Sequence, residues 1–267
     1  HMKKLILSIV IILVELAAAG QNIHYYNPTP TVSQEKQGTT TLNIGYNRQR
    51  LVGEMSVNVT NHFILTGAYS GFSKSSPSFM SPSVNRLNEN LRVGSVHASY
   101  IYKINGDKLA VEGQLGFSGT RYNYSDLPTT EPDAVHVYRE KVSFDEKALH
   151  SSVLLHFYKG KSDIYVGLRH VESQYGDLTI SNSIYDDGVD VSNMRSAGDG
   201  LVLGCVYTYK KLSIHAQLGI LSSPPIKLEQ EETAYGWWLF GTRTYTNTTI
   251  YSGTDFTSMI KLGYTLN

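Results

Sequence analysis

The chain has 267 residues, of which 41% are hydrophobic and only 17% charged, and it contains 19 tyrosines and 23 glycines. A disordered chain would have fewer aromatic residues and more charge, so this composition indicates a folded protein. The formal net charge is zero, which leaves no basic excess for binding nucleic acid. The single cysteine, Cys205, excludes an internal disulfide framework and a cysteine-based zinc site.

The start of the chain has the pattern of a targeting segment. Two lysines precede an apolar run that ends at Val14, and the small residues Ala17–Gly20 follow. This order predicts a signal peptide over residues 1–20 and export through the Sec pathway, with His1-Met2 in front of it as a vector remnant. The apolar run is shorter than the roughly 20 residues that a membrane-spanning helix needs. Residues 21–38 are then expected to be a periplasmic lead-in.

Beyond this lead-in, apolar residues recur with a period of two. Leu109, Val111 and Leu115 fall on one side of a predicted strand, and Glu112 and Gln114 fall on the other. The same alternation predicts ten strands along the chain. Their ranges are 39–47, 50–59, 62–72, 91–104, 108–120, 148–158, 162–172, 199–209, 212–222 and 254–266.

The connections between these strands alternate in length. Those after the second, fourth, sixth and eighth strands are tight, and one contains the hairpin signal Asn105-Gly106. Those after the third, fifth, seventh and ninth strands have roughly 18 to 31 residues. Tight turns on one side and long loops on the other are typical of a transmembrane barrel, whereas a soluble secreted sandwich remains the alternative.

Aromatic residues occur at both ends of the apolar faces, as at the two interfaces of a bilayer. We therefore predict an all-β chain whose residues 39–267 form a transmembrane antiparallel up-and-down β-barrel of about ten strands, with long extracellular loops. The aromatic positions are Phe63, Tyr102, Phe157, Tyr207, Tyr209 and Tyr264 at the tight-turn end, and Tyr46, Tyr69, Phe117 and Phe256 at the loop end.

In this pattern of strands and connections, the chain resembles the small outer-membrane β-barrel proteins of Gram-negative bacteria. The segment Tyr25–Pro30, followed by Glu35–Gly38 and the first strand, is similar to the N-terminal lead-in of barrels from the Bacteroidota. The resemblance implies a bacterial outer-membrane location, with outer-membrane lipid around the barrel. The chain departs from the pattern at its C-terminus, where Tyr264-Thr265-Leu266-Asn267 stands in place of a final aromatic residue.

The inward positions of the predicted strands carry several charged and histidine residues. The interior of an eight-stranded barrel is just filled by its own side chains, and a ten-stranded barrel encloses little more space. Charges in this interior must therefore be paired. We interpret them as a salt-bridged plug, with a narrow polar path or proton relay as the alternative. Lys261 is expected to approach Glu54, and Arg169 to pair with at least one acid. The set comprises Glu54, Glu112, Arg169, Lys261, His97, His150, His156 and His215.

The long connections contain two further candidate sites. Tyr235, Trp237, Trp238 and Phe240 form an aromatic group beside acidic residues, which fits contact with a partner protein or a glycan. The alternative is that these rings pack under neighbouring loops or extend the aromatic girdle. Carboxylates suit calcium, but their spacing here is not that of an EF-hand, and such clusters are usually turns, so no metal is expected. These carboxylates are Asp186, Asp187 and Asp190.

An enzyme would need histidine and acidic groups converging at the loop rim, and His170, Glu172 and Asp177 are the nearest candidates. They match no recognisable motif. We therefore expect a non-enzymatic outer-membrane protein without a cofactor, whose surface loops bind a partner or form part of an envelope complex. A narrow transport pore is the first alternative, and an outer-membrane hydrolase or acyltransferase is the second.

Overall fold

The computed structural model describes residues 37–47, 50–76, 84–104, 108–128, 140–182, 189–191, 194–222, 226–235, 242–251 and 254–266. These residues form β-strands joined by turns, and none of them forms a helix long and apolar enough to cross a membrane. The strands are β1 (Thr40–Asn47), β2 (Arg50–Asn58), β3 (Phe63–Ser76), β4 (Val84–Lys103), β5 (Leu109–Pro128), β6 (Glu140–Lys159), β7 (Ser162–Asn182), β8 (Val189–Val191), β9 (Met194–Tyr209), β10 (Leu212–Ser222), β11 (Ile226–Tyr235), β12 (Thr242–Tyr251) and β13 (Thr254–Leu266).

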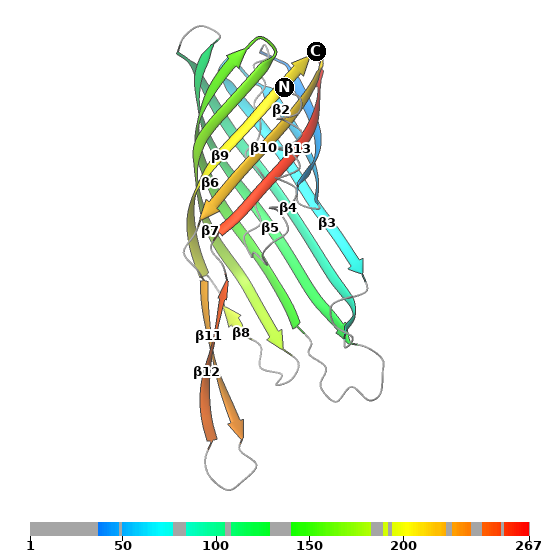
Figure 1. The fold of residues 1–267 in the computed structure, drawn as a ribbon, viewed down its shortest axis with the longest axis vertical. Helices are drawn as coiled ribbons and strands as arrows, with labels where there is room; N and C mark the ends of the chain where they lie inside the picture. The colour runs from blue at the N-terminus through cyan, green and yellow to red at the C-terminus, as the bar shows by residue number, and fades with distance from the viewer. Residues whose placement is uncertain are drawn as a thin grey trace, which may run out of the picture.

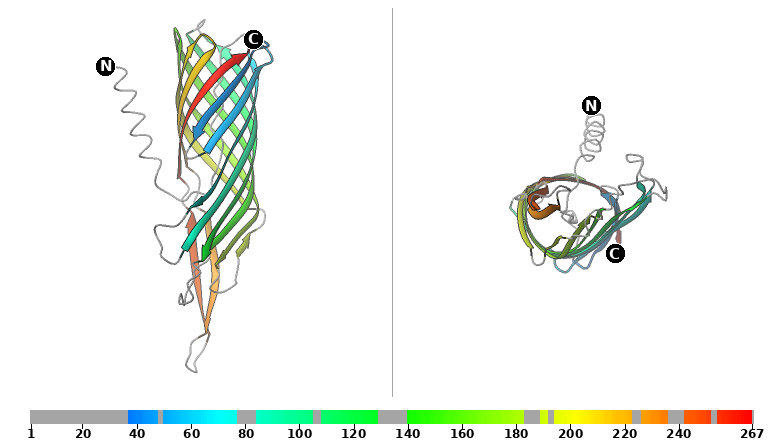
Figure 2. Two further views of the ribbon diagram at one scale, coloured as in Figure 1. Left: turned by 90° about the vertical axis from the view of Figure 1, so that its right-hand side faces the viewer. Right: turned by 90° about the horizontal axis from the view of Figure 1, so that it is seen from below.

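Ten of these strands form a closed antiparallel barrel. The hydrogen-bonded order runs from β6 through β5, β4, β3, β2 and β1 to β13, β10, β9 and β7, and β7 pairs back onto β6. Figure 2 shows this ring in a view along the barrel. The short strand β8 adds to β7 outside the ring order. The predicted ten-stranded barrel is therefore confirmed.

Tight turns join the strands at one end of the barrel. Lys159 pairs with Ser162, and Tyr209 pairs with Leu212, so each of these hairpins has only two residues between its strands. The first of the two residues is in the left-handed region in both, at φ 63° for Gly160 and φ 56° for Lys210. Short hairpins of this kind favour such a conformation because it matches the twist of the strands.

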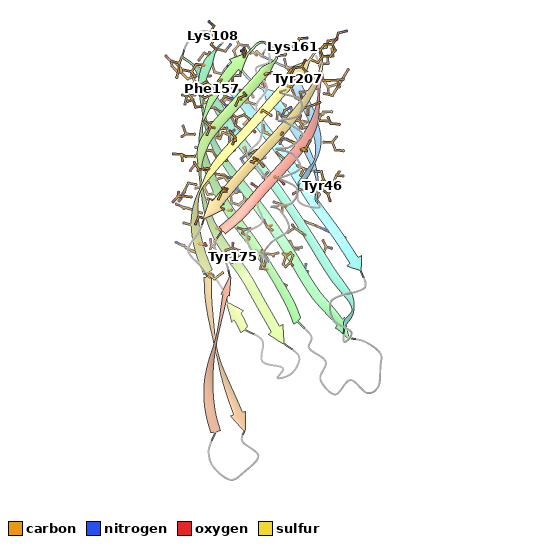
Figure 3. All side chains as sticks on the ribbon, in the orientation of Figure 1. Tyr46, Lys108, Phe157, Lys161, Tyr175 and Tyr207 are labelled. Atoms are coloured by element: carbon orange, nitrogen blue, oxygen red, sulfur yellow. The ribbon has the colours of Figure 1, made fainter. Side chains whose placement is uncertain are left out.

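The outer surface of the barrel is apolar and its interior is polar. Leu201 and Leu203 are 57% and 50% exposed, whereas Lys261 is completely buried. This inversion of the usual pattern is what a lipid solvent requires. Figure 3 shows Phe157 and Tyr207 towards the tight-turn end, near Lys108 and Lys161. The predicted girdle positions that are exposed are Tyr46, Tyr69, Tyr102, Phe117, Phe157, Tyr207, Tyr209 and Tyr264.

Several strands continue well beyond their predicted ends. Strands β4, β5 and β6 have 20 residues each and β7 has 21, whereas a tilted strand crosses the hydrocarbon in about 9–11 residues. On β5 the outward face changes from apolar Phe117 to exposed Arg121, while inward Tyr122 stays buried. The prediction followed apolar outward positions, so it stopped at the edge of the lipid although the strand pairing goes on.

The last long connection was wrongly expected to be a loop. It contains the two-stranded sheet of β11 and β12, which extends past the barrel at the long-connection end (Figure 1). Strand β11 includes the run Glu229-Gln230-Glu231-Glu232, in which consecutive polar residues remove any alternation in hydropathy. The pattern that identified the barrel strands is therefore missing from this hairpin.

Candidate functional site

The residues predicted to face the lumen lie in the interior of the barrel. All seven residues proposed for the polar network, together with His97, are buried, with exposed fractions between 0% and 6%. They come from β2, β4, β5, β6, β7, β10 and β13, and the alternation of each strand turns them inward. These residues are Glu54, His97, Glu112, His150, His156, Arg169, His215 and Lys261.

The first ion pair joins strands on either side of β1. Lys261 Nζ donates a hydrogen bond to Glu54 Oε2 at 2.8 Å, and Asn43 Nδ2 donates to the other carboxylate oxygen at 2.8 Å. Gly45 lies under the lysine stem, because a Cβ at this position would be 2.5 Å from Lys261 Cγ. Glu54 is thus held by a cation and an amide, as a buried charge requires.

A second cluster lies nearer the tight turns. His156 Nε2 is 2.8 Å from Glu112 Oε2, and His156 Nδ1 is 3.0 Å from Asp163 Oδ2. An imidazole that meets ionised carboxylates through both nitrogens must donate from both, which only the protonated ring can do. Gln114 Nε2 also donates to Glu112 Oε1 at 2.6 Å. Asp163 was not among the predicted site residues, although it stands at an inward position of β7.

A third cluster contains Arg169. Its Nη2 is 2.8 Å from His150 Nδ1, and His150 Nε2 is 2.6 Å from Ser118 Oγ. Arginine can only donate, so Nδ1 accepts and the proton of His150 sits on Nε2, where it is donated to the serine. His150 therefore cannot take a proton from Ser118. A serine–histidine nucleophile is excluded at this position.

The described contact of Arg169 is with His150, and its expected pairing with a carboxylate stays a prediction. His156 and Gln114 occupy the two oxygens of Glu112, the acid that was expected to lie across the lumen from Arg169. His97 lies beside this cluster, with its ring centroid 5.7 Å from that of His150. The arginine thus contacts a neutral imidazole on the neighbouring strand, a contact that strand separation alone did not indicate.

Inward glycines leave room for the large side chains of this network. A Cβ at Gly116 would collide with the His97 ring, and one at Gly204 would collide with the Tyr165 ring. His215 has a similar neighbour, since a Cβ at Gly263 would be 3.3 Å from its Nε2, which is 2.7 Å from Ser213 Oγ. The sequence did not indicate the role of these glycines, because it does not show which large side chain packs against an inward glycine.

A further buried acid lies towards the long connections. Ser173 Oγ donates to Glu146 Oε1 at 2.6 Å, and Glu146 is 3% exposed. The rings of Tyr122, Phe144 and Tyr175 pack together nearby, with centroids 5.2 and 5.6 Å apart in sequence order. All five residues of this group fall in two long connections that were predicted to be loops. The barrel interior is thus filled beyond the level of the apolar outer band.

The candidate catalytic residues at the rim are not in the lumen. His170 Nδ1 is 2.8 Å from Asp199 Oδ1 and its Nε2 is 3.4 Å from Glu172 Oε1. All three are among the outward positions of β7 and β9, and the two acids are well exposed. Asp177 lies on β7. The arrangement is an exposed ion-pair cluster on the outside of the barrel.

The proposed loop sites are described only in part. Trp237, Trp238 and Phe240, with Asp186 and Asp187, lie outside the described residues, whereas Tyr235 is the last residue of β11 and Asp190 pairs with Thr179. Within the described parts of the chain, no group of three histidine, cysteine or acidic residues has metal-binding geometry.

Comparison with known proteins identifies the fold. The chain is similar to the outer-membrane protease OmpT from Escherichia coli, with 9% sequence identity, a TM-score of 0.51, and coverage of 85% of this chain and 93% of that one. It is also similar to the translocator domain of the autotransporter NalP from Neisseria meningitidis, with 13% identity, a TM-score of 0.45, and coverage of 85% and 86%. No protein-family model and no curated protein matches the sequence.

These similarities concern the fold alone. Together with the apolar outer surface and polar interior, the fold similarity to OmpT identifies a transmembrane β-barrel of the bacterial outer-membrane type, which places the chain in the bacterial outer membrane.

Proposed function

We propose that this protein is a closed, non-enzymatic barrel that anchors a surface-exposed binding segment, residues 223–253, in the outer membrane. In this proposal the long-connection end faces the outside of the cell. The segment binds a partner protein or a glycan, or joins the barrel to an envelope complex. The observation that carries the proposal is the position of β11 and β12 beyond the end of the barrel (Figure 1).

The register of the barrel supports a separate role for this segment. Ser222 at the end of β10 pairs directly with Thr254 at the start of β13. The barrel is therefore complete without residues 223–253, and a tight turn between these two residues would be sufficient to close it. A 31-residue insertion at such a point is a feature that barrel stability does not require.

The composition of the segment fits recognition. Strand β11 carries Glu229, Glu231 and Glu232 and ends at Tyr235. Two tryptophans and a phenylalanine follow within the next five residues of the sequence. Aromatic residues next to charge are the combination that binding hot spots favour.

The filled lumen argues against a wide transport path. Lys261, Glu112, His156 and His215 are at most 1% exposed, which supports a lumen without a water-filled passage beside them. The tautomer of His150 also leaves Ser118 without a base, and His170 lies on the outer face of the barrel. The buried charges of the lumen therefore support a membrane anchor over a transport pore.

A deletion tests this proposal directly. Residues 223–253 are replaced by Asn-Gly between Ser222 and Thr254, a pair of residues suited to a two-residue hairpin. We expect the shortened chain to fold, as shown by heat-modifiable migration on gels. It should no longer retain the partner that co-purifies with the full-length chain from native outer membranes after cross-linking.

Removal of residues 129–139, from the connection between β5 and β6, is the matched control and should leave that partner bound. Direct binding of the purified partner to the full-length chain completes the test. If the partner binds the variant without residues 223–253 as tightly as it binds the full-length chain, the proposal is wrong.

A further inference from the structure

Two arginines lie side by side on the outer surface of the barrel. Arg92 on β4 pairs in register with Arg121 on β5, and both are exposed. Like charges directly opposite each other destabilise a sheet. Nearby, Lys147 on β6 is paired with Gly119 and is also exposed. Three basic side chains thus gather at one place, just beyond the apolar positions of these strands.

Next to this basic group, the paired outward positions of β4 and β5 are both glycines. Gly94 on β4 pairs with Gly119 on β5, and a Cβ at either position would meet nothing within 4 Å. Tyr69 on β3 flanks the glycines on one side and Lys147 flanks them on the other. The two glycines therefore form a flat floor bordered by a tyrosine, a lysine and the two arginines.

The neighbouring row towards the tight turns is apolar. Val96, Phe117 and Leu149 pair in sequence across β4, β5 and β6, and their exposed fractions are 61%, 49% and 51%. This row belongs to the lipid-facing surface. The glycine floor and the basic group consequently lie at the boundary between hydrocarbon and headgroups, where basic side chains meet lipid phosphates.

The charge of this patch stays positive when its neighbouring acids are counted. Arg121 Nε donates to Asp145 Oδ1 at 3.0 Å and its Nη2 is 3.4 Å from Oδ2, which leaves its Nη1 donors available to another group. Arg92 and Lys147 add two further positive charges. On β7, the strand next to β6, the outward acid Glu172 pairs with Leu149, and Asp199 on β9 lies beside His170. Three basic side chains against Asp145 and Glu172 leave the patch on β4–β6 with a net positive charge.

We propose that Arg92, Arg121 and Lys147 bind the phosphate of a membrane lipid, whose headgroup rests on Gly94 and Gly119. The acyl chains lie along Val96, Phe117 and Leu149. Guanidinium groups suit this role because they bind phosphate through two parallel hydrogen bonds. We expect a lipid rather than a soluble anion as the ligand, because the apolar row adjoins the two glycines and can contact acyl chains.

Native mass spectrometry of the full chain in detergent tests the site, with dioleoyl phosphatidic acid as the anionic lipid and dioleoyl phosphatidylcholine as the zwitterionic one. We expect Arg92→Gln and Arg121→Gln each to weaken the first phosphatidic acid binding event about fivefold, as expected for one basic group near a lipid surface. Gly119→Val should weaken it as well without changing charge, since its side chain would cover the floor. Phosphatidylcholine binding should not change.

Two control variants separate the site from general effects. Arg195→Gln removes an exposed arginine from β9, and Gly113→Val fills another open outward position of β5. Both should bind phosphatidic acid like the unchanged chain. The proposal is overturned if Arg195→Gln weakens binding as much as Arg92→Gln does, or if the three site variants bind normally. It is also overturned if millimolar inorganic phosphate displaces the lipid, because the ligand would then be a soluble anion.

Discussion

Lys261 and Glu54 stand 207 residues apart in the sequence, yet the lysine Nζ lies 2.8 Å from a carboxylate oxygen inside the barrel. Strand β1 separates their two strands and contributes Gly45, which leaves room for the lysine stem. This pair therefore connects the last strand of the chain with one of the first. Both side chains are fully or almost fully removed from solvent.

Replacing one member of this pair should destabilise the barrel more than replacing both members together. Lys261→Met and Glu54→Met each leave one buried charge without its partner, and each should lower the free energy of unfolding by about 3–5 kcal/mol if the site stays dry. The double variant should lose clearly less than the sum, since no charge remains to be paired. Urea unfolding in lipid vesicles measures all three values, and additive losses would show that the two residues do not interact.

The glycine under the lysine should tolerate no side chain. Gly45→Ala places a methyl group against Lys261 and the backbone of Ile260, so we expect a loss of about 1–3 kcal/mol from overpacking. Gly53→Ala on β2 is the control, because its Cβ would meet nothing within 4 Å. The same urea experiment compares the two variants, and equal stability would contradict the close packing of the lysine.

Cys205 should face lipid. It is exposed on β9 between Leu203 and Tyr207, both about half exposed. A water-soluble maleimide should fail to modify it in a bilayer, whereas an apolar pyrene maleimide should react. Cys205→Ala should change the free energy of unfolding by no more than about 0.5 kcal/mol. Rapid modification by the water-soluble reagent would place this residue in contact with water.

The aromatic cluster beyond the lipid band should stabilise only the extended ends of the strands. Phe144 is 2% exposed and packs between Tyr122 and Tyr175. Phe144→Ala should open this region and make it sensitive to added protease, while the membrane-embedded barrel remains heat-modifiable. Asp145→Ala, at an exposed neighbouring position, is the control. Unchanged protease resistance of the Phe144 variant would show that the strand ends do not depend on this cluster.

The sequence was sufficient to predict the barrel because lipid and lumen impose opposite polarities on alternate residues. Leu201, Leu203, Cys205 and Tyr207 show this pattern clearly on β9, and their outward positions are found in the structure. Beyond the hydrocarbon both faces of a strand can be polar, so residues such as Arg121 and Asn123 carried no strand signal. The β11–β12 hairpin was missed for the same reason.

The interior could be predicted residue by residue but not contact by contact. Alternation placed Arg169, His150 and Glu112 inside, yet their partners depend on strand stagger and on which neighbours are glycines. Gly116 leaves the space that the His97 ring occupies, and Asp163 gives His156 a second carboxylate opposite Glu112. These relations arise from pairing register, which a single sequence does not specify for strands far apart in the chain.

Electrical conductance in planar bilayers tests the closed barrel most directly. The purified full-length chain should insert without opening a steady ion-conducting channel, because paired charges fill its lumen. Arg169→Ala removes the large side chain that contacts His150, so this variant should open a small conductance or lower the temperature of heat modification on gels. A steady ohmic conductance from the unchanged chain would contradict the closed barrel and support a transport pore in place of a membrane anchor.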